Sequence, residues 1–226
     1  MRFVLIHGAY HDSWCWHLLR QELLRQGHQV VAPDLPTDDP EAGADGYASL
    51  VLKAIEPSGE PAILVGHSLA GLTLPVVAAR MPTQLMVFLC ALLPVPGLSF
   101  DQQGAQMDSG FRASQPPIAN ADGSTSWPEE GAIETYYHDC EAGLARQAAR
   151  RLRRQQWRVT QEPTPLTAWP DVAAKYIVAS HDRAIAPDYC RQIARDRWHV
   201  DPIEIDSGHS PFLSGPVELA RLLLAL

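Results

Sequence analysis

The feature that most constrains this chain is the segment from Ile63 to Gly71, in which a short apolar run passes through Gly-His-Ser-Leu-Ala-Gly into a stretch of helical length. Small residues on both sides of Ser68 let the backbone turn sharply between a strand and a helix, so that the hydroxyl projects above the sheet as a nucleophile requires. Ala70 stands where the strict pattern has glycine, and it meets the same requirement for small size. A serine at this place can also be an N-cap, so the nucleophile interpretation needs support from the rest of the chain.

Short apolar runs bounded by glycine or proline alternate with amphipathic stretches of helical length. The runs predicted as strands are Phe3–Ile6, Gln29–Ala32, Ala62–Val65, Leu85–Leu92, Tyr176–Ala179 and Pro202–Ile205. The stretches predicted as helices are Trp14–Gln26, Tyr47–Ile55, Leu69–Arg80, Pro187–Arg195 and Pro216–Leu224. Continuous hydrophobicity in the strands indicates that both faces of the sheet are covered. The predicted fold class is therefore α/β, with a mostly parallel six-stranded sheet and helices on both faces.

Two later strands are each followed by a residue that can act together with Ser68. Asp182 follows the strand that ends at Ala179, and His209 follows the next strand along the chain. The fold that carries this turn places nucleophile, acid and base in that order, and the carboxyl ends of parallel strands meet at one edge. We therefore expect Ser68, Asp182 and His209 to form a catalytic triad. Asp206 is the nearest alternative acid, and we interpret it as a turn residue.

The first strand ends in His7-Gly8-Ala9, which brings the backbone amide of Ala9 to the same edge as Ser68. Together with the amide of Leu69 it is expected to form an oxyanion hole, in which each donor typically contributes ~3 kcal/mol to transition-state binding. Gly8 allows the two backbones to approach closely. His7 is interpreted as a residue that positions the loop.

Residues 97–171 interrupt the alternation, because they contain no convincing strand and mix proline, serine, glutamine and aromatic residues. We expect them to form a cap inserted into a core made of residues 1–96 and 172–226. Residues 141–158 are predicted to be helical. This stretch carries Arg146, Arg150, Arg151, Arg153, Arg154 and Arg158. Such a charge run is typical of a solvated face, with steering of an anionic substrate as the alternative.

Several side chains are candidates for an apolar substrate pocket beneath this cap. The candidate substrate-binding residues are Gly8, Tyr10, Trp127, Tyr137, Trp157 and Phe212. Tyr136 and Trp169 are further aromatic candidates for the same pocket. Each of these aromatic side chains, taken singly, is more typical of core or cap packing.

Charge and motif content argue against several other classes. The net charge of −8 disfavours nucleic-acid binding, which depends on clustered Lys and Arg. His7, His11 and His17 lack the His-Glu-x-x-His pattern of a zinc site, and no nucleotide-binding glycine motif is present. We expect neither a metal nor another cofactor, and a small molecule as the partner. Monomer and homodimer both stay open.

Cysteine spacing and hydropathy bear on location. The four cysteines form no CxxC pair, which disfavours a zinc site or a disulfide framework. The first apolar run is too short for a signal peptide, and no segment approaches the roughly 18 apolar residues of a membrane span. We expect a cytoplasmic protein that does not bind membranes.

Along nearly its whole length the sequence resembles one branch of the α/β-hydrolase superfamily, which contains plant methyl-salicylate-type esterases, hydroxynitrile lyases and bacterial esterase relatives. The segments that carry the resemblance are His7–Trp16, Gly66–Gly71 and Gly208–Phe212. The resemblance implies an α/β-hydrolase fold with a helical cap and a triad of Ser68, Asp182 and His209.

The resemblance also favours ester hydrolysis over cyanohydrin cleavage. Hydroxynitrile lyases of this branch carry threonine where this chain has Gly8, and lysine where it has Ser210. The alternatives are other chemistry on the same scaffold, namely a lactonase, C–C hydrolase, lyase or cyclase, and a small-molecule receptor that keeps the fold.

Overall fold

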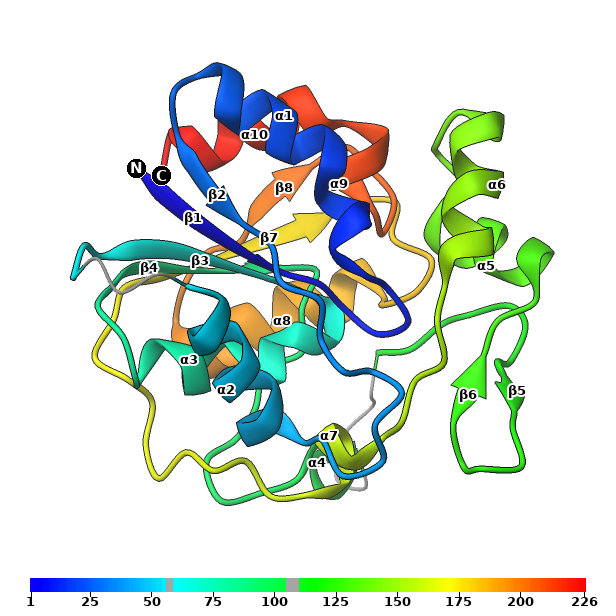
Figure 1. Cartoon of the computed structure of the whole chain (residues 1–226), viewed down its shortest axis with the longest axis horizontal. Coiled ribbons are helices and arrows are strands. Elements are labelled where there is room, and N and C mark those ends of the chain that lie inside the picture. Colours follow the sequence, from blue (N-terminus) through cyan, green and yellow to red (C-terminus); the bar gives the residue numbers. More distant parts are fainter. Residues whose placement is uncertain (56–58, 105–109) are drawn as a thin grey trace.

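The computed structural model of the chain describes residues 1–55, 59–104 and 110–226 (Figure 1). Six strands form a parallel sheet in the order β2-β1-β3-β4-β7-β8. Their bounds are β1 Arg2–Ile6, β2 Gln29–Val31, β3 Ala62–His67, β4 Thr83–Leu89, β7 Ala174–Ala179 and β8 Ile203–Ile205. The α/β fold class and the parallel six-stranded sheet predicted from the sequence are confirmed.

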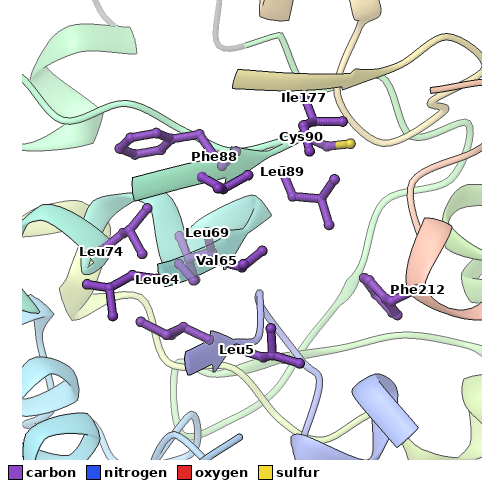
Figure 2. Packing of buried hydrophobic residues seen from close by; sticks show 14 of the residues in the cluster. Leu5, Leu64, Val65, Leu69, Leu74, Phe88, Leu89, Cys90, Ile177 and Phe212 are labelled. Carbon is purple, nitrogen blue, oxygen red and sulfur yellow. The ribbon is translucent and has the colours of Figure 1, made fainter. Parts of the chain in front are cut away.

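The register of the central strands brings their carboxyl ends to one edge. Ile6 of β1 pairs with Gly66 of β3, and His67 of β3 pairs with Leu89 of β4. Every residue of β1 and β3 is buried, because helices cover both faces. Figure 2 shows side chains from these three strands packed in one continuous core. Each fully buried aliphatic side chain of this kind contributes roughly 1.5–3 kcal/mol.

Helices flank the sheet on both sides, with α1 and α10 over one face and α2, α3 and α8 over the other (Figure 1). These helices and two short 3-10 turns are η1 Ser13–Trp16, α1 His17–Arg25, α2 Ala44–Ala54, η2 Ser68–Leu72, α3 Leu74–Ala78, α8 Pro187–Trp198, α9 Pro211–Ser214 and α10 Pro216–Leu224. The predicted helix 69–80 is divided, since η2 closes with the Thr73 N–H bonded to the Ala70 carbonyl before α3 begins. In the part of the chain that the structure describes, no helix is both long and apolar enough to cross a bilayer.

In the segment between β4 and β7, two helices and a two-stranded hairpin lie beyond the carboxyl ends of the sheet strands, and the last part runs back to the start of β7 (Figure 1). The elements of this segment are α4 Phe100–Gly104, β5 Ile118–Ala119, β6 Thr125–Ser126, α5 Glu129–Tyr136, α6 Ala142–Arg151 and α7 Arg158–Gln161. The expectation that this segment holds no strand is wrong, because β5 and β6 form a short antiparallel hairpin. Gly123 permits its tight turn with a φ of +81°. Residues 105–109, which fall inside the expected cap, lie outside the described residues.

The helix predicted over residues 141–158 is also corrected, because α6 ends at Arg151. The backbone then turns away to bond with the core. The Arg153 N–H donates to the Tyr10 carbonyl at 2.7 Å, and the Gln156 N–H donates to the Thr37 carbonyl at 2.7 Å. After Arg151 these hydrogen bonds to other segments replace the hydrogen bonds that would continue the helix.

Most of the arginines in this stretch bind carboxylates of the protein itself. The pairs are Arg150–Glu129, Arg151–Asp12, Arg153–Asp38, Arg154–Asp122 and Arg158–Glu41. Exposed pairs of this kind each contribute only about 0–1 kcal/mol. Their consequence is geometric, since three of them tie the segment around α6 to loops that follow β1 and β2. The arrangement disfavours the steering of an anionic substrate.

Candidate active site

Ser68 lies where β3 meets η2, and its backbone is in the left-handed region with a φ of +52°. A non-glycine residue in this region typically costs about 1–3 kcal/mol and is held in place by its surroundings. Space is limited on both sides of the serine. A Cβ added to Gly66 would lie 3.2 Å from Leu74, and one added to Gly71 would lie 1.9 Å from the Leu92 carbonyl oxygen. Packing therefore requires glycine at position 71 and leaves little space at position 66.

His209 and Asp182 form a buried pair. His209 Nδ1 lies 2.7 Å from Asp182 Oδ2, and both side chains are 1% exposed. Asp182 Oδ1 accepts the backbone N–H groups of Ala184 and Ile185 at 2.7 and 2.9 Å. Because a carboxylate only accepts, Nδ1 carries the proton and Nε2 of the neutral ring is left as an acceptor.

The alternative acid occupies a different environment. Asp206 lies at the surface, where its carboxylate is 2.7 Å from Nε2 of the exposed His181. Its side chain is 90% exposed and pairs away from His209. The geometry therefore favours Asp182 over Asp206 as the partner of the histidine.

Ser68 and His209 line one cavity of about 390 Å³. The predicted site residues Ala9, Leu69, Tyr10 and Trp157 line it as well. Its other described lining residues are Leu92, Phe100, Asp101, Phe111, Pro117, Tyr136, Thr160, Gln161, Ala184 and Ile185. Of these only Tyr136 is a sequence-predicted pocket residue, because the others lie in loops and in the short helices α4 and α7, which carry no local signature of a pocket. The Tyr136 ring packs 5.5 Å from that of His209.

Four predicted substrate-binding residues are absent from the described lining of this cavity: Gly8, Trp127, Tyr137 and Phe212. All four are buried and lie behind this lining. Trp127 packs edge-on against Tyr10, with ring centroids 6.1 Å apart.

The other three residues also act behind the lining. The Tyr137 hydroxyl is hydrogen-bonded to His11 Nε2 at 2.9 Å. Phe212 is fully buried, and its ring lies 4.9 Å from that of His67. A Cβ on Gly8 would lie 2.9 Å from His67 Nδ1 and 2.9 Å from Ser68 Cβ. Gly8 therefore lets the loop after β1 press against the nucleophile turn.

The loop that carries His209 is also held from outside the core. Asp139 Oδ2, between α5 and α6, accepts the Gly208 N–H at 2.6 Å and the Ser207 hydroxyl at 3.0 Å. Burial opposes ionisation here, but hydrogen bonds from Gly208, Ser214 and Ser207 outweigh it and lower the pKa of Asp139. The ionised carboxylate fixes the two residues that precede His209.

Three further histidines are buried around the site, and burial lowers the pKa of each below its ordinary value. His7 Nε2 accepts the Leu35 N–H at 2.9 Å, which agrees with the predicted loop-positioning role. His67 Nε2 lies 2.9 Å from the His209 carbonyl oxygen and donates to it. For His11 the pKa falls to about 3. All three rings are therefore neutral at neutral pH.

We expect the free energy of unfolding to fall as the pH is lowered from about 7 to about 4. The unfolded chain binds protons on His7, His11 and His67 near the ordinary pKa of 6.5, whereas the folded chain does not. The free energy of unfolding is thus highest above pH 6.5. It falls as the pH is lowered from that value to the pKa of the folded state, by up to about 1.4 kcal/mol per pH unit for each histidine. Urea unfolding at several pH values measures this slope.

In the variant His11→Asn the unfolding free energy should depend less steeply on pH, because about one proton fewer is taken up on unfolding. Equal slopes for wild type and His11→Asn would contradict the assignment of a neutral buried His11.

Comparison with known proteins gives matches over nearly the whole chain. The profile described as "Alpha/beta hydrolase family" matches residues 3–222. Methyl jasmonate esterase 1 of Vitis vinifera is 28% identical over 254 residues, which cover 98% of this chain and 94% of that protein. Alpha-hydroxynitrile lyase of Arabidopsis thaliana is 29% identical over 253 residues, which cover 99% of this chain and 96% of that protein.

Solved structures show the same fold. The crystal structure of polyneuridine aldehyde esterase superposes with a TM-score of 0.82 at 21% identity, covering 99% of this chain and 98% of that one. Tomato Methylketone Synthase I, solved with 2-tridecanone, gives a TM-score of 0.85 at 22% identity and covers 99% of this chain and 96% of that one. At this identity the likeness concerns the fold alone.

Proposed function

The chain belongs to the alpha/beta hydrolase family, and we propose that it is a carboxylesterase that cleaves a small, largely apolar ester through an acyl-enzyme on Ser68. The resemblance to methylesterases and hydroxynitrile lyases that the sequence predicted is confirmed by relatives of both kinds. The observation that carries the proposal is the buried His209–Asp182 pair, whose histidine lines the same cavity as Ser68.

In this mechanism His209 Nε2 takes the proton of the Ser68 hydroxyl while Oγ attacks the ester carbonyl carbon. Asp182 holds the imidazole with its proton on Nδ1 and stabilises the imidazolium. The backbone N–H groups of Ala9 and Leu69 donate to the oxyanion, and each typically contributes ~3 kcal/mol. Collapse of the intermediate expels the alcohol, which receives the proton from His209. Water then attacks the acyl-enzyme by the same route and releases the acid.

Two positions favour hydrolysis over the lyase alternative. The threonine expected in a hydroxynitrile lyase would stand at Gly8, where even a Cβ would lie 2.9 Å from Ser68 Cβ. The expected lysine would stand at Ser210, whose side chain is fully buried and is absent from the described cavity lining. Neither position offers a polar group to a cyanohydrin.

The proposal assigns residues 97–171 as a cap and residues 1–96 and 172–226 as the core. The partner is a small-molecule substrate. We also propose a cytoplasmic location, since a reducing compartment suits a chain whose cysteines are free thiols. These cysteines are Cys15, Cys90, Cys140 and Cys190.

Steady-state hydrolysis of p-nitrophenyl esters of increasing acyl length tests the proposal. We expect kcat/KM to rise about fourfold per added methylene while the chain lies on the apolar walls, since burying one CH₂ contributes ~0.8 kcal/mol. It should fall once the acyl group exceeds the cavity of about 390 Å³. Trp157→Ala, which removes a lining side chain, should move the optimum to longer chains. A folded protein that turns over none of these esters would rule out the proposed activity.

A further inference from the structure

The loop after β1 contains one peptide group that side chains hold on both sides. This is the Ala9–Tyr10 peptide. Its carbonyl oxygen, on Ala9, accepts from His11 Nδ1 at 2.7 Å. Its N–H, on Tyr10, donates to Gln155 Oε1 at 3.2 Å. The Arg153 N–H then binds the next carbonyl oxygen, that of Tyr10, at 2.7 Å.

The conformation held in this way is not one that the chain adopts by itself. Tyr10 has a φ of +65°, in the left-handed region that side chains other than glycine disfavour. It is 2% exposed and lines the cavity beside Ser68. Such strain persists only where surrounding contacts over-determine it, and it is concentrated at functional sites. The contacts that hold it come from Gln155 and Arg153, far away in the sequence.

Gln155 itself is rigidly placed. Its side chain is fully buried, and Nε2 donates to the Tyr47 hydroxyl at 3.1 Å. Its backbone forms a two-way pair with Thr125, with N–O distances of 2.9 and 3.0 Å. The amide orientation is fixed, because the Tyr10 N–H requires the oxygen and the Gln156 carbonyl oxygen requires the nitrogen.

We propose that Gln155 is a positioning residue for the oxyanion hole: by fixing the Ala9–Tyr10 peptide, it aims the Ala9 N–H at the oxygen that becomes negative in the reaction. This inference rests on the proposed function. The Ala9 amide and the held peptide share one α-carbon, so a rotation of the peptide re-aims the donor. A misplacement of about 1 Å in such a site can lower the rate about 10²-fold. The segment around Gln155 therefore supports catalysis as well as covering the pocket.

The variant Gln155→Met keeps the size of the side chain and removes the acceptor of the Tyr10 N–H. We expect kcat for the best p-nitrophenyl ester to fall by about 10- to 100-fold, less than the loss of a whole oxyanion donor. KM should change by no more than about twofold, because the donor acts on the transition state.

A pair of inhibitors separates this role from a general loss of packing. A trifluoromethyl ketone adds to the nucleophile and presents an oxyanion, whereas the matching methyl ketone binds without that charge. The Ki of the first should rise in Gln155→Met by about the same factor as kcat falls, and the Ki of the second should stay within about twofold. Equal loss for both inhibitors, or a kcat within about twofold of wild type, would overturn the proposal.

Two control variants match this substitution. Gln156→Met removes a neighbouring, nearly buried glutamine whose Nε2 donates to the Asp122 carbonyl at 3.2 Å. Tyr47→Phe removes one acceptor of Gln155 Nε2, which still donates to the Gln156 carbonyl oxygen, and leaves the Tyr10 bond in place. Both should keep the wild-type ratio of the two Ki values. If Gln155→Met does not fold, Gln155→Asn takes its place, because it withdraws the oxygen by one methylene. It should again weaken the trifluoromethyl ketone more than the methyl ketone. A ratio of the two Ki values equal to that of wild type in Gln155→Asn would overturn the proposal.

Failure of this inference is distinguishable from failure of the proposed function. If wild type hydrolyses esters and Ser68→Ala does not, while Gln155→Met matches wild type, only the role of Gln155 is wrong. If wild type hydrolyses none of the esters, the proposed function itself is wrong.

Discussion

Replacing Ser68 by alanine is expected to lower kcat for ester hydrolysis by on the order of 10⁶-fold. The substitution removes the only atom that forms the acyl bond in the proposed mechanism, and the remaining oxyanion donors supply only the residual rate. The fold should be retained, because alanine leaves the turn between β3 and η2 no larger. Steady-state turnover of the best p-nitrophenyl ester measures the effect. Thermal unfolding checks that the variant is folded.

Ser180→Ala is a matched control for that substitution. Ser180 follows β7, and its hydroxyl donates to the Ile205 carbonyl at 3.2 Å instead of facing the cavity. This variant should keep kcat within about twofold of wild type. Residual activity of Ser68→Ala within about tenfold of wild type would contradict the role of Ser68 as nucleophile.

The variant Asp182→Asn is expected to lower kcat by about 10⁴-fold, the loss typical of a triad acid. Asparagine keeps the shape but presents an N–H₂ donor where His209 Nδ1–H needs an acceptor, so the imidazole takes the tautomer that cannot accept the Ser68 proton. KM should change little, since Asp182 does not line the cavity among the described residues. Stopped-flow or steady-state assays at pH 8 measure the loss.

Asp206→Asn is the control for the acid, because it changes the alternative carboxylate by the same substitution. Asp206 pairs with the exposed His181 and should be dispensable for turnover. A larger loss in Asp206→Asn than in Asp182→Asn would reverse the assignment of the two acids.

The parts that could be predicted from the sequence are those fixed by local rules. The strand Ala62–His67 contains the continuous apolar run Ala62–Val65 because helices cover both faces of the sheet, and this pattern is visible in the sequence. The turn at Ser68 could be predicted because its neighbours Gly66 and Gly71 are small, and close packing against the Leu92 carbonyl oxygen requires this at Gly71. His209 and Asp182 followed from chain order, since parallel strands bring their carboxyl ends to one edge.

The parts that could not be predicted depend on long-range contacts. Phe100, at the start of α4, and Phe111, in an irregular segment, line the cavity through contacts distant in the sequence, and no periodicity marks them. The helix predicted through residue 158 ends at Arg151, since the following backbone bonds to Tyr10 and Thr37. The role of Gln155 could not be predicted from the sequence for the same reason. Its partner Tyr10 is 145 residues away.

The sequence predicts more aromatic residues on the pocket wall than the described cavity lining contains. Tyr137 and Phe212 are buried behind the lining, where they pack against His11 and His67. A buried aromatic ring and a substrate-contacting ring have the same signature in a sequence, because both are large, apolar and next to a motif. Only the position of the cavity separates them.

Whether Ser68 is the nucleophile of a carboxylesterase is tested most directly by covalent trapping with a p-nitrophenyl alkylphosphonate followed by mass spectrometry. The reagent's phosphorus is attacked by the serine oxygen, p-nitrophenolate leaves, and a stable adduct stays on the protein. The account predicts one adduct per chain, located on Ser68 by peptide mapping and absent from Ser68→Ala. Labelling of another residue, or no labelling of a protein that hydrolyses esters, would contradict it.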